Sequence, residues 1–402
     1  MTKFEKAFLL VNFILYGSLA VFSYAYVDLN LTISQNPLAL KFVSVMQQLG
    51  YFNRPQATLV YLFLIIFTFS FFIFNLWLFY KLKVGLKYLI VSTITSTLVL
   101  VFAYPFLSSD LFNYLFDAKI ILNYQSNPYT HRALDFPNDE WIRFMRWIHR
   151  TSPYGPLWLG MSLIPAAAGF GKFILNFLAF KIFIGAFHLV NSFLIYKTLS
   201  KINPKLALFG TAFYSLNPLF LIEGVVNAHN DLVVATFLLT SIFLLVNTKK
   251  TYAAVAIFAG TLIKYIQILT LPWYLLHGYF KKISTGKLII SNILTMAVFT
   301  YLYSSFKITV PFISSGSTQV QFQPWYLFWT IPLVALIPKP SLLALAIAVS
   351  IGASLRYLPY LYYGDWSQPG TINFMQIVTL APPIVVLIAL SVKKFFKSSE
   401  KN

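Results

Sequence analysis

The chain has 402 residues, of which 58% are hydrophobic and only 10% charged, with a formal net charge of +19 and no cysteine. Soluble domains carry about 25% charged residues, so this composition excludes an ordinary soluble protein, and the lack of cysteine excludes disulfides and thiolate chemistry. A basic balance can indicate nucleic-acid binding. In a chain this apolar it instead favours lysine-rich cytoplasmic loops and contact with anionic lipid, so we expect no nucleic-acid partner.

Apolar windows long enough to cross a bilayer recur along the whole chain. The first, Ala7 to Val27, is too long for the core of a signal peptide and lacks a small-residue cleavage site, so we interpret it as a retained span. We therefore predict an all-α integral membrane protein, a multispan bundle of about 11–13 transmembrane helices. The predicted spans are roughly 7–27, 58–80, 86–107, 173–196, 206–222, 231–248, a short pair within 252–280, 288–304, 325–338, 341–358 and 372–391.

The placement of charges tests these spans. With the N-terminus in the cytoplasm, the cytoplasmic segments contain lysine but no arginine, and every acid except Glu5 and Glu400 falls outside, together with every arginine. The segment 156–171 is apolar but short and broken by proline and glycine. Counting it as a crossing fits the charge rule less well, so we expect it to be re-entrant or interfacial.

Arginine gathers where the acids are, and its planar fork suits phosphate and carboxylate. We therefore expect an integral, multi-pass protein of the plasma membrane whose active site lies on the extracytoplasmic side. No linker or soluble domain is visible, so residues 1–402 are predicted to form a single transmembrane catalytic domain. Residues 108–172 form its outer-face loop and re-entrant segment.

The outer-face loop begins with a row of polar residues directly after the third predicted span. Asp110, Tyr114 and Asp117 are spaced to share one face of an amphipathic helix. Partial desolvation at the membrane boundary is expected to raise a carboxylate pKa toward that of a useful general base. The alternative is structural: Ser108, Ser109 or Asp110 caps the helix. The two interpretations are compatible.

Farther along the loop, Arg143, Arg146 and Arg150 are spaced to share a helical face and to cradle a phosphate. The alternative is an interfacial helix that contacts lipid headgroups and is anchored by tryptophan. The turn Ser152-Pro153-Tyr154-Gly155-Pro156 is rigid, and structure alone can explain it. Its place before the short apolar segment also makes it a suitable pocket wall.

A second polar cluster contains Glu223 and the run Asn227-Ala228-His229-Asn230-Asp231, between two predicted spans. This many hydrogen-bonding side chains exceeds what capping the next helix requires, although Asn230 or Asp231 accounts for part of it as a cap. A lone histidine with one aspartate is weak evidence for a metal. The cluster favours recognition of sugar hydroxyls or orientation of a base.

Three further features concern cations and aromatic residues. Lys264 lies in an apolar stretch, where a lysine is functional by default or snorkels to the interface. Arg356, near the outer end of a span, is a further candidate for phosphate binding. In the run from Gln319 to Tyr326, an aromatic belt explains Trp325 and its neighbour but not the three glutamines.

In these motifs the chain resembles the GT-C glycosyltransferases. The series SSD-x3-Y-x2-D, NPY, SPYGPLW, NAHND and QPWYLFW, from about Ser108 to Tyr326, resembles the polyprenyl-phosphate-mannose-dependent mannosyltransferases of bacteria and archaea. It is more distantly similar to the eukaryotic mannosyltransferases of glycolipid-anchor synthesis. The resemblance implies a lipid-phosphate sugar donor, inverting transfer at the outer face and a catalytic aspartate at Asp110. Such enzymes often carry two adjacent acids, whereas the next acid here is Asp117.

We therefore predict transfer of a monosaccharide, mannose by resemblance, from a polyprenyl phosphate to a hydroxyl of a glycan or glycolipid, with an aspartate as general base. The chain has no glycine-rich nucleotide fingerprint. The predicted catalytic residues are Asp110 and Asp117. The predicted phosphate-binding residues are Arg143, Arg146, Arg150, Lys264 and Arg356. The predicted sugar- or acceptor-binding residues are Tyr114, Asn127, Tyr129, Tyr154, Glu223, Asn227, His229, Asn230, Asp231, Gln323 and Trp325.

Two alternatives stay open at this stage. A transporter or flippase of lipid-linked glycans should show inverted repeats and charges near mid-membrane, and neither is evident. A ligase that transfers a glycan from a lipid diphosphate is separated from a transferase by its donor. No cofactor is assigned with certainty, a divalent metal is left open, and the sequence names neither sugar nor acceptor.

Overall fold

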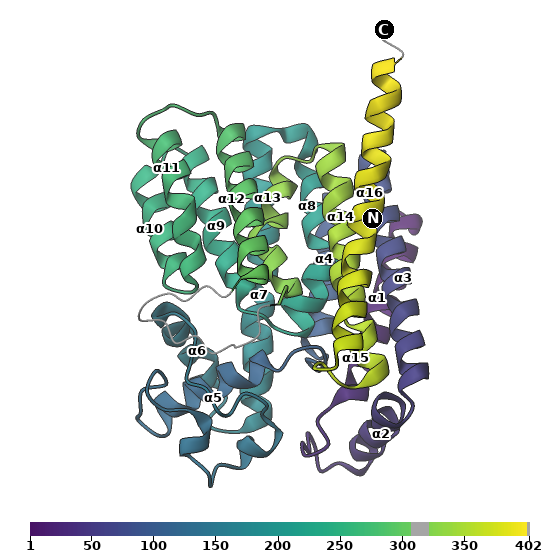
Figure 1. Ribbon diagram of the computed structural model, residues 1–402, viewed down its shortest axis with the longest axis vertical. Helices are drawn as coiled ribbons and strands as arrows, with labels where there is room; N and C mark the ends of the chain where they lie inside the picture. The colour runs from purple at the N-terminus through teal and green to yellow at the C-terminus, as the bar shows by residue number, and fades with distance from the viewer. Residues whose placement is uncertain (307–320, 400–402) are drawn as a thin grey trace.

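The computed structural model describes residues 1–306 and 321–399, with side chains as far as residue 394. The secondary structure of these ranges is helical and contains no strand, as predicted (Figure 1). The α-helices are α1 (Lys3–Ser23), α2 (Pro37–Gln47), α3 (Arg54–Tyr80), α4 (Leu86–Val101), α5 (Asp110–Leu122), α6 (Pro156–Ala168), α7 (Phe173–Ile202), α8 (Ala207–Ser215), α9 (Asp231–Val246), α10 (Lys250–Thr261), α11 (Leu271–Gly278), α12 (Thr285–Ser305), α13 (Ile331–Leu336), α14 (Pro340–Leu355), α15 (Leu358–Tyr363) and α16 (Pro369–Ser399).

Within the described ranges, six helical segments are long and apolar enough to cross a membrane, which makes the chain a multispan membrane protein. A seventh is added if the bent pair Pro204–Ser215 and Phe220–Val226, which meet at 57°, counts as one span. The other predicted spans appear as shorter apolar helices. For example, the segment predicted at 86–107 ends as a helix at Val101, and the pair within 252–280 is α10 and α11, joined by the 3-10 helix η7 (Tyr265–Thr270). Hydropathy windows count apolar residues but do not detect that α4 ends at Val101, four residues before Pro105, or that α10 ends at Thr261.

The bundle has two dissimilar ends. The segments containing α2, α5 and α6 lie together at one end, the lower end in Figure 1. The connections from α3 to α4, α7 to α8, α9 to α10, α11 to α12 and α13 to α14 lie at the other end, and they contain lysine but no arginine. All six arginines lie at the end with α2, α5 and α6, which we call the site end. The connections at the opposite end therefore contain no arginine, whereas the site end holds every arginine together with some lysines, such as Lys119.

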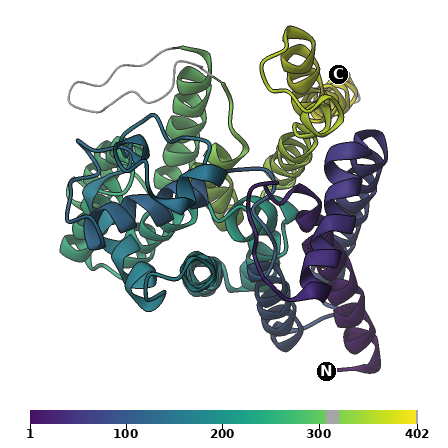
Figure 2. The same cartoon turned by 90° about the horizontal axis from the view of Figure 1, so that it is seen from below.

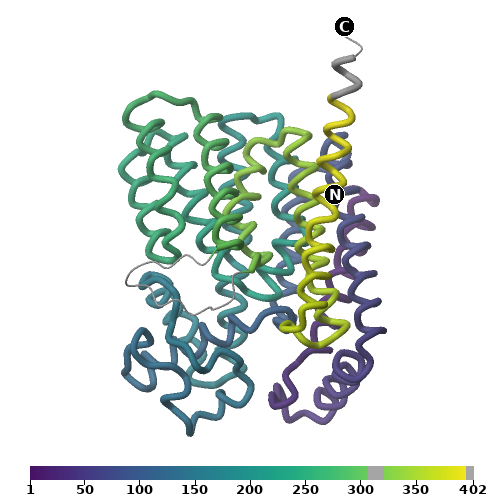
Figure 3. Tube along the Cα trace, viewed as in Figure 1, coloured from purple at the N-terminus to yellow at the C-terminus, as the bar shows by residue number. Residues whose placement is uncertain are grey.

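The helices are stacked across the bundle in a consistent order. Helix α1 packs on α4, α4 on α7, α7 on α9 and α9 on α10. Seen along the bundle in Figure 2, α7 lies between the N-terminal helices and the later ones. Helix α16 packs along α14 and extends past the bundle at the end opposite the site, as the trace in Figure 3 shows.

The short helix α6 does not run alongside the bundle. It lies at the site end, where it packs against α5 and α7 (Figure 1). Its 13 residues span about 20 Å, which is less than the hydrocarbon thickness. A re-entrant or interfacial position for the segment 156–171 stays a prediction.

Candidate active site

Helix α5 places Asp110 at its first turn. The hydroxyl of Ser108 accepts a hydrogen bond from the Asp110 backbone N–H at 3.2 Å, and the N-cap residue, Ser109, makes no capping bond with its side chain. The Asp110 side chain is 16% exposed, so it remains accessible. A carboxylate at a helix N-terminus is stabilised by the helix dipole. The predicted helix is thus confirmed, and the Asp110 carboxylate is not used as its cap.

The Asp110 carboxylate faces His229. Nδ1 of His229 lies 3.5 Å from Oδ2 of Asp110, and Nε2 lies 3.4 Å from Oε2 of Glu223. The imidazole is completely buried and stacks on Trp325 with 3.9 Å between ring centroids. Asn227 donates to the same Glu223 oxygen at 3.0 Å. Two polar motifs that are more than a hundred residues apart in the sequence therefore meet in one cluster.

The local backbone explains why these residues converge. The chain between α8 and α9 forms a π-helix, η6 (Phe220–Val226), which ends in the loop that holds Ala228 at φ 56°. A left-handed residue at this point reverses the chain. Lys181, completely buried in α7, donates to the carbonyls of Val225 and Val226 at the end of η6. This lysine supports the loop that presents His229.

The charges in this cluster act on one another. Burial alone raises the pKa of Asp110, but His229, and Arg150 and Lys264 beyond it, outweigh burial and hold that pKa below its usual value. The rise in carboxylate pKa that we expected from desolvation therefore does not occur at Asp110, because the neighbouring cations stabilise its carboxylate more than desolvation destabilises it. Burial lowers the pKa of His229, but the carboxylates of Asp110 and Glu223 together raise it to about 9.

A second ion pair lies beside the first. Nζ of Lys264 is 2.7 Å from Oδ2 of Asp231, and the indole N–H of Trp329 donates to the other oxygen at 2.7 Å. Asp231 is fully buried and begins α9, whereas Lys264 follows the end of α10. The lysine thus lies at the site end and turns toward an acid. Trp329 belongs to the 3-10 helix η8 (Pro324–Trp329).

The proline-flanked turn before α6 is fixed against α10. The N–H of Gly155 donates to the carbonyl of Ile263 at 3.0 Å, and that of Leu157 donates to Leu262 at 3.0 Å. A Cβ at Gly155 would lie 2.1 Å from the Leu262 carbonyl oxygen, so only glycine permits this approach. Tyr154 packs edge-on against Tyr114, 4.9 Å between centroids. The turn forms a wall beside the Asp110 cluster.

Asp117 occupies a separate part of the site. It lies on the next turns of α5 and lines a small cavity with Arg150, Ser152 and Trp147. Burial raises the pKa of Asp117 to about 7, although Ser152 and Arg150 each lower it. One of its carboxylate oxygens is buried without a hydrogen-bond partner. Arg150 lowers the pKa of both Asp110 and Asp117 and therefore lies near both acids.

The three arginines of the loop do not share a helical face, so that prediction is wrong. The only helix in this part of the described loop is the 3-10 helix η4 (Glu140–Phe144), and the chain is extended at Met145. Buried Trp141 and Phe144 pack on Phe173, so aromatic packing and not helical periodicity sets this backbone. Arg143 is exposed, Arg146 donates to the Tyr360 hydroxyl at 3.4 Å, and Arg150 lies over Trp147.

The remaining predicted residues lie at different distances from the cluster. Asn127 is exposed, and its side chain accepts the N–H of Tyr129 at 2.9 Å, which forms a local turn. The Tyr129 hydroxyl donates to the Tyr154 carbonyl at 2.8 Å. Gln323 is the N-cap of η8, which carries Trp325. Gln319 lies outside the described residues.

Arg356 is buried at the end of α14. Its guanidinium donates to Gln321 at 3.3 Å, and its Nε is buried without a hydrogen-bond partner. The next residue, Tyr357, interacts with Glu223. We did not predict a role for Tyr357 or Lys181. Lysine inside an apolar span was the one available signal, because such a residue is costly unless it has a function.

Asn230 sits between the two ion pairs with its side chain unsatisfied. Its backbone N–H faces the Tyr114 hydroxyl at 3.3 Å, whereas both polar atoms of its fully buried amide lack a partner. A buried, unpaired amide is costly unless a ligand or water satisfies it. Among the described residues, no group of three or more His, Asp or Glu side chains is placed to hold a metal ion.

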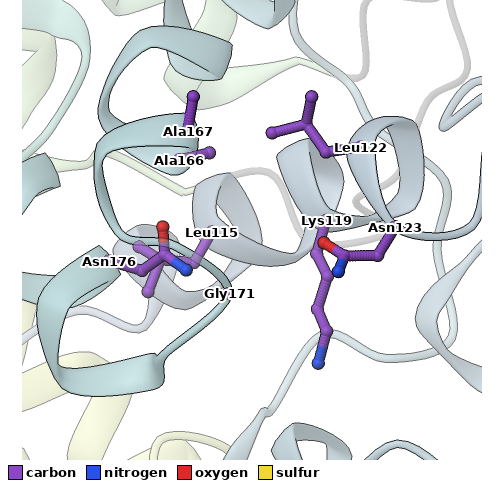
Figure 4. A pocket seen from close by; sticks show the side chains of 8 residues that line it. All are labelled: Leu115, Lys119, Leu122, Asn123, Ala166, Ala167, Gly171 and Asn176. Carbon is purple, nitrogen blue, oxygen red and sulfur yellow. The ribbon is translucent and has the colours of Figure 1, made fainter.

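A larger cavity of about 180 Å³ lies away from this cluster, where α5, α6 and α7 meet (Figure 4). Leu115, Ala166 and Asn176 are among its lining residues. Lys119, which also lines it, forms an ion pair with Asp139 at 2.5 Å and lies over the Trp141 ring. No acid of the Asp110 cluster lines this cavity.

Comparison with known proteins yields one match. Residues 15–280, about two thirds of the chain, match the model of a family described as alpha-(1->6)-mannopyranosyltransferase, N-terminal domain. The matched region contains Asp110, Glu223, His229 and Lys264. No curated protein and no solved structure matches the chain.

Proposed function

We propose a mechanism for this chain, which belongs to the alpha-(1->6)-mannopyranosyltransferase family and is a mannosyltransferase of the GT-C type. It transfers mannose from a polyprenyl phosphate to a hydroxyl of a glycan or glycolipid, with inversion and with Asp110 as general base. The observation that supports this most is the Asp110 carboxylate itself. It is ionised, partly exposed, fixed at the start of α5 and flanked by Arg150 and Lys264.

The proposed step is a single displacement. The acceptor oxygen attacks the anomeric carbon while Asp110 accepts the hydroxyl proton, and the bond from that carbon to the phosphate oxygen breaks with its electron pair staying on the phosphate. The transition state is oxocarbenium-like, as in other glycosyl transfers. Bond formation to such a carbon makes the acceptor hydroxyl strongly acidic, so a carboxylate of low pKa suffices as base. The phosphate leaves without a general acid.

Among the five cations predicted to bind phosphate, we propose that Arg150 and Lys264 stabilise the leaving phosphate. Both act electrostatically on Asp110. Charge grows on the phosphate oxygen as the bond breaks, and positioned cations in a desolvated site each stabilise such charge by about 3–4 kcal/mol. Arg356 donates to Gln321 and does not act on Asp110. Arg143 and Arg146 point to solvent and to Tyr360 respectively, and we assign them no role in transfer.

Stereochemistry and topology complete the proposal. An inverting step on a β-linked donor yields an α-linked product, which agrees with the linkage in the family description. We place the site end outside the cytoplasm, because the opposite end carries the lysine-only connections. Asn230, with its unpaired amide, and Tyr154 are proposed to contact sugar hydroxyls.

The test is transfer of labelled mannose from synthetic polyprenyl-phosphate mannose by the purified protein in detergent, with cell-envelope lipids as acceptor. Asp110→Asn should reduce transfer about 10²–10⁴-fold, the usual contribution of a general base. Equal transfer by both proteins would remove Asp110 from its role. Transfer only from a lipid diphosphate would replace the proposed donor, and product analysis showing retention would overturn inversion.

A further inference from the structure

Neither ring nitrogen of His229 is open to a ligand. One nitrogen faces Asp110 at 3.5 Å, the other faces Glu223 at 3.4 Å, and one face of the ring stacks on Trp325. The side chain is completely buried. A histidine that contacts sugar hydroxyls needs a nitrogen open to the ligand, and this one offers none. Our interpretation of His229 and Glu223 as sugar-binding residues therefore does not fit their geometry.

The geometry also determines how many protons the ring carries. A neutral imidazole has one N–H and one lone pair, so it can donate to only one carboxylate while its lone pair faces the other. Only the imidazolium donates from both nitrogens. Two carboxylates at opposite edges of one buried ring therefore favour a proton on each nitrogen, which gives each carboxylate an N–H to face.

The surrounding charges agree with a protonated ring. Asp110 comes from α5, Glu223 from η6 and Asp231 from α9, and the cations facing them are Lys264 after α10 and Arg150 from the loop. The tyrosine side chains that interact with these carboxylates are Tyr114, Tyr154, Tyr326 and Tyr357. With His229 protonated, Asp110, Glu223 and Asp231 face three cations, one of which, Arg150, also acts on Asp117. With His229 neutral, the buried cluster would carry an uncompensated negative charge, which is costly in a desolvated site.

We infer that His229 is a positioning residue that stays protonated at neutral pH, with Glu223 as its buried counterion. The imidazolium holds Oδ2 of Asp110 and leaves the other oxygen of this partly exposed side chain to receive the acceptor proton. The kinetic consequences rest on the function proposed above. The charge state itself does not.

A second connection links Glu223 to Asp110 through the backbone. The side-chain amide of Asn227 donates through Nδ2 to Glu223 at 3.0 Å, and its Oδ1 accepts the N–H of Leu107 at 3.2 Å, three residues before Asp110. Glu223 therefore acts on the base both through His229 and through the chain that leads into α5. Neither Glu223 nor Asn227 reaches the reacting atoms, because both are fully buried behind the imidazole.

The charge state can be measured without turnover. The chain has five histidines, so titration of histidine labelled with ¹³C and ¹⁵N, followed by NMR in detergent, resolves few signals, and His229→Gln assigns the one that disappears. We expect the His229 signal to titrate near pH 9 and to shift to lower pH in Glu223→Gln, which removes one of its two anions. Titration of His229 at or below about 6.5, the ordinary histidine value, would overturn the inference.

The pH dependence of kcat then distinguishes positioning from a merely structural role. In His229→Gln, Asp110 loses its adjacent cation, so the pKa of Asp110 rises. The fall of kcat on the acid side of the pH profile (the acid limb) should then move to higher pH. KM for donor and acceptor should stay within about twofold. In Glu223→Gln the alkaline limb should move to lower pH, because His229 loses its proton sooner. A rise in KM with unmoved limbs would instead indicate sugar binding and overturn the inference.

His188→Gln is the matched control, since His188 is equally buried but bonds to the Ser215 carbonyl away from the site. It should leave both limbs in place. The two hypotheses fail separately. If no polyprenyl-phosphate sugar supports turnover while His229 still titrates near pH 9 and responds to Glu223→Gln, the charged network stands and the proposed transferase donor is wrong. Normal transfer with a His229 that titrates as ordinary histidine overturns the network alone.

Discussion

Lys264 and Asp231 form an ion pair of 2.7 Å that joins the end of α10 to the start of α9 beside the candidate catalytic acid. The partners differ in exposure: Asp231 is completely buried, whereas the Lys264 side chain is 22% exposed. The indole N–H of Trp329 donates to the other Asp231 oxygen, so both oxygens of the carboxylate have a partner. Asp231 therefore has a structural role in this pair, whereas the ammonium group of Lys264 remains accessible.

Replacing Lys264 by Met should destabilise the protein strongly, by about 3–5 kcal/mol, because it leaves a buried carboxylate without its cation. The double variant Lys264→Met with Asp231→Asn should recover much of that loss, since an asparagine oxygen can still accept from Trp329. Thermal unfolding in detergent of both single variants and the double variant measures the coupling, expected at about 0.5–3 kcal/mol.

Transfer activity separates the two roles of the pair. If Lys264 stabilises the leaving phosphate, the double variant should recover stability but not kcat. Recovery of both would show that the lysine acts only on the fold.

Arg150 should matter for catalysis and Arg143 should not. Arg150→Gln removes the cation near both Asp110 and Asp117, and we expect kcat for mannosyl transfer to fall about 10²–10³-fold, as for other groups that stabilise transition-state charge. Arg143→Gln is the control from the same loop, because Arg143 is exposed and makes no contact in the site. Equal losses in the two variants would point to surface charge and not to a phosphate site.

How far the sequence predicted the fold depends on what each signal measures. Hydropathy located every long helix, and the separation of lysine from arginine anticipated the two dissimilar ends of the bundle. Helix α9 and the short pair α10 and α11 lie where spans were predicted, whereas α4 ends at Val101, short of the predicted 107; fewer segments than predicted reach full spanning length. Periodicity likewise predicted α5 correctly and failed for the arginine loop, where buried Trp141 and Phe144 determine the backbone.

The candidate site was predicted as a set of residues but not as a set of contacts. Asp110, His229 and Lys264 were each singled out, yet no sequence spacing shows that Asp110 meets His229 or that Lys264 meets Asp231. These pairs depend on the crossing of α5, α9 and α10 in space. For the same reason the direction of the Asp110 pKa was predicted wrongly, since desolvation can be inferred from position but the neighbouring cation cannot.

Asp117 should make the protein less stable as pH rises. Its pKa is raised to about 7 in the folded protein, against about 3.9 for an unperturbed aspartate. A carboxyl group with a raised folded-state pKa binds its proton more tightly when folded, so stability is lost from about pH 4 upward and the loss is complete above about pH 7. Asp117→Asn removes this effect.

The Asp117→Asn variant should therefore raise the thermal midpoint more at about pH 8 than at about pH 5, measured in one detergent at constant ionic strength. Asp135→Asn is a suitable control, because Asp135 is paired with Arg132 at the surface and its pKa is lowered. A gain from Asp117→Asn that is the same at both pH values would show that Asp117 is ionised throughout.

Two glycines near α6 give opposite predictions for the same substitution. Gly155→Ala puts a Cβ 2.1 Å from the Leu262 carbonyl oxygen, so the turn must move away from α10 and lose the bond from the Gly155 N–H to Ile263. Because Lys264 directly follows these residues, the displacement should reduce both the thermal midpoint and kcat. Gly160→Ala lies inside α6 with no atom within 4 Å of the new Cβ, and it should stabilise the helix by about 0.5–1 kcal/mol without changing kcat. If Gly155→Ala were as benign as Gly160→Ala, the turn would not be held against α10, and it could not serve as a wall of the site.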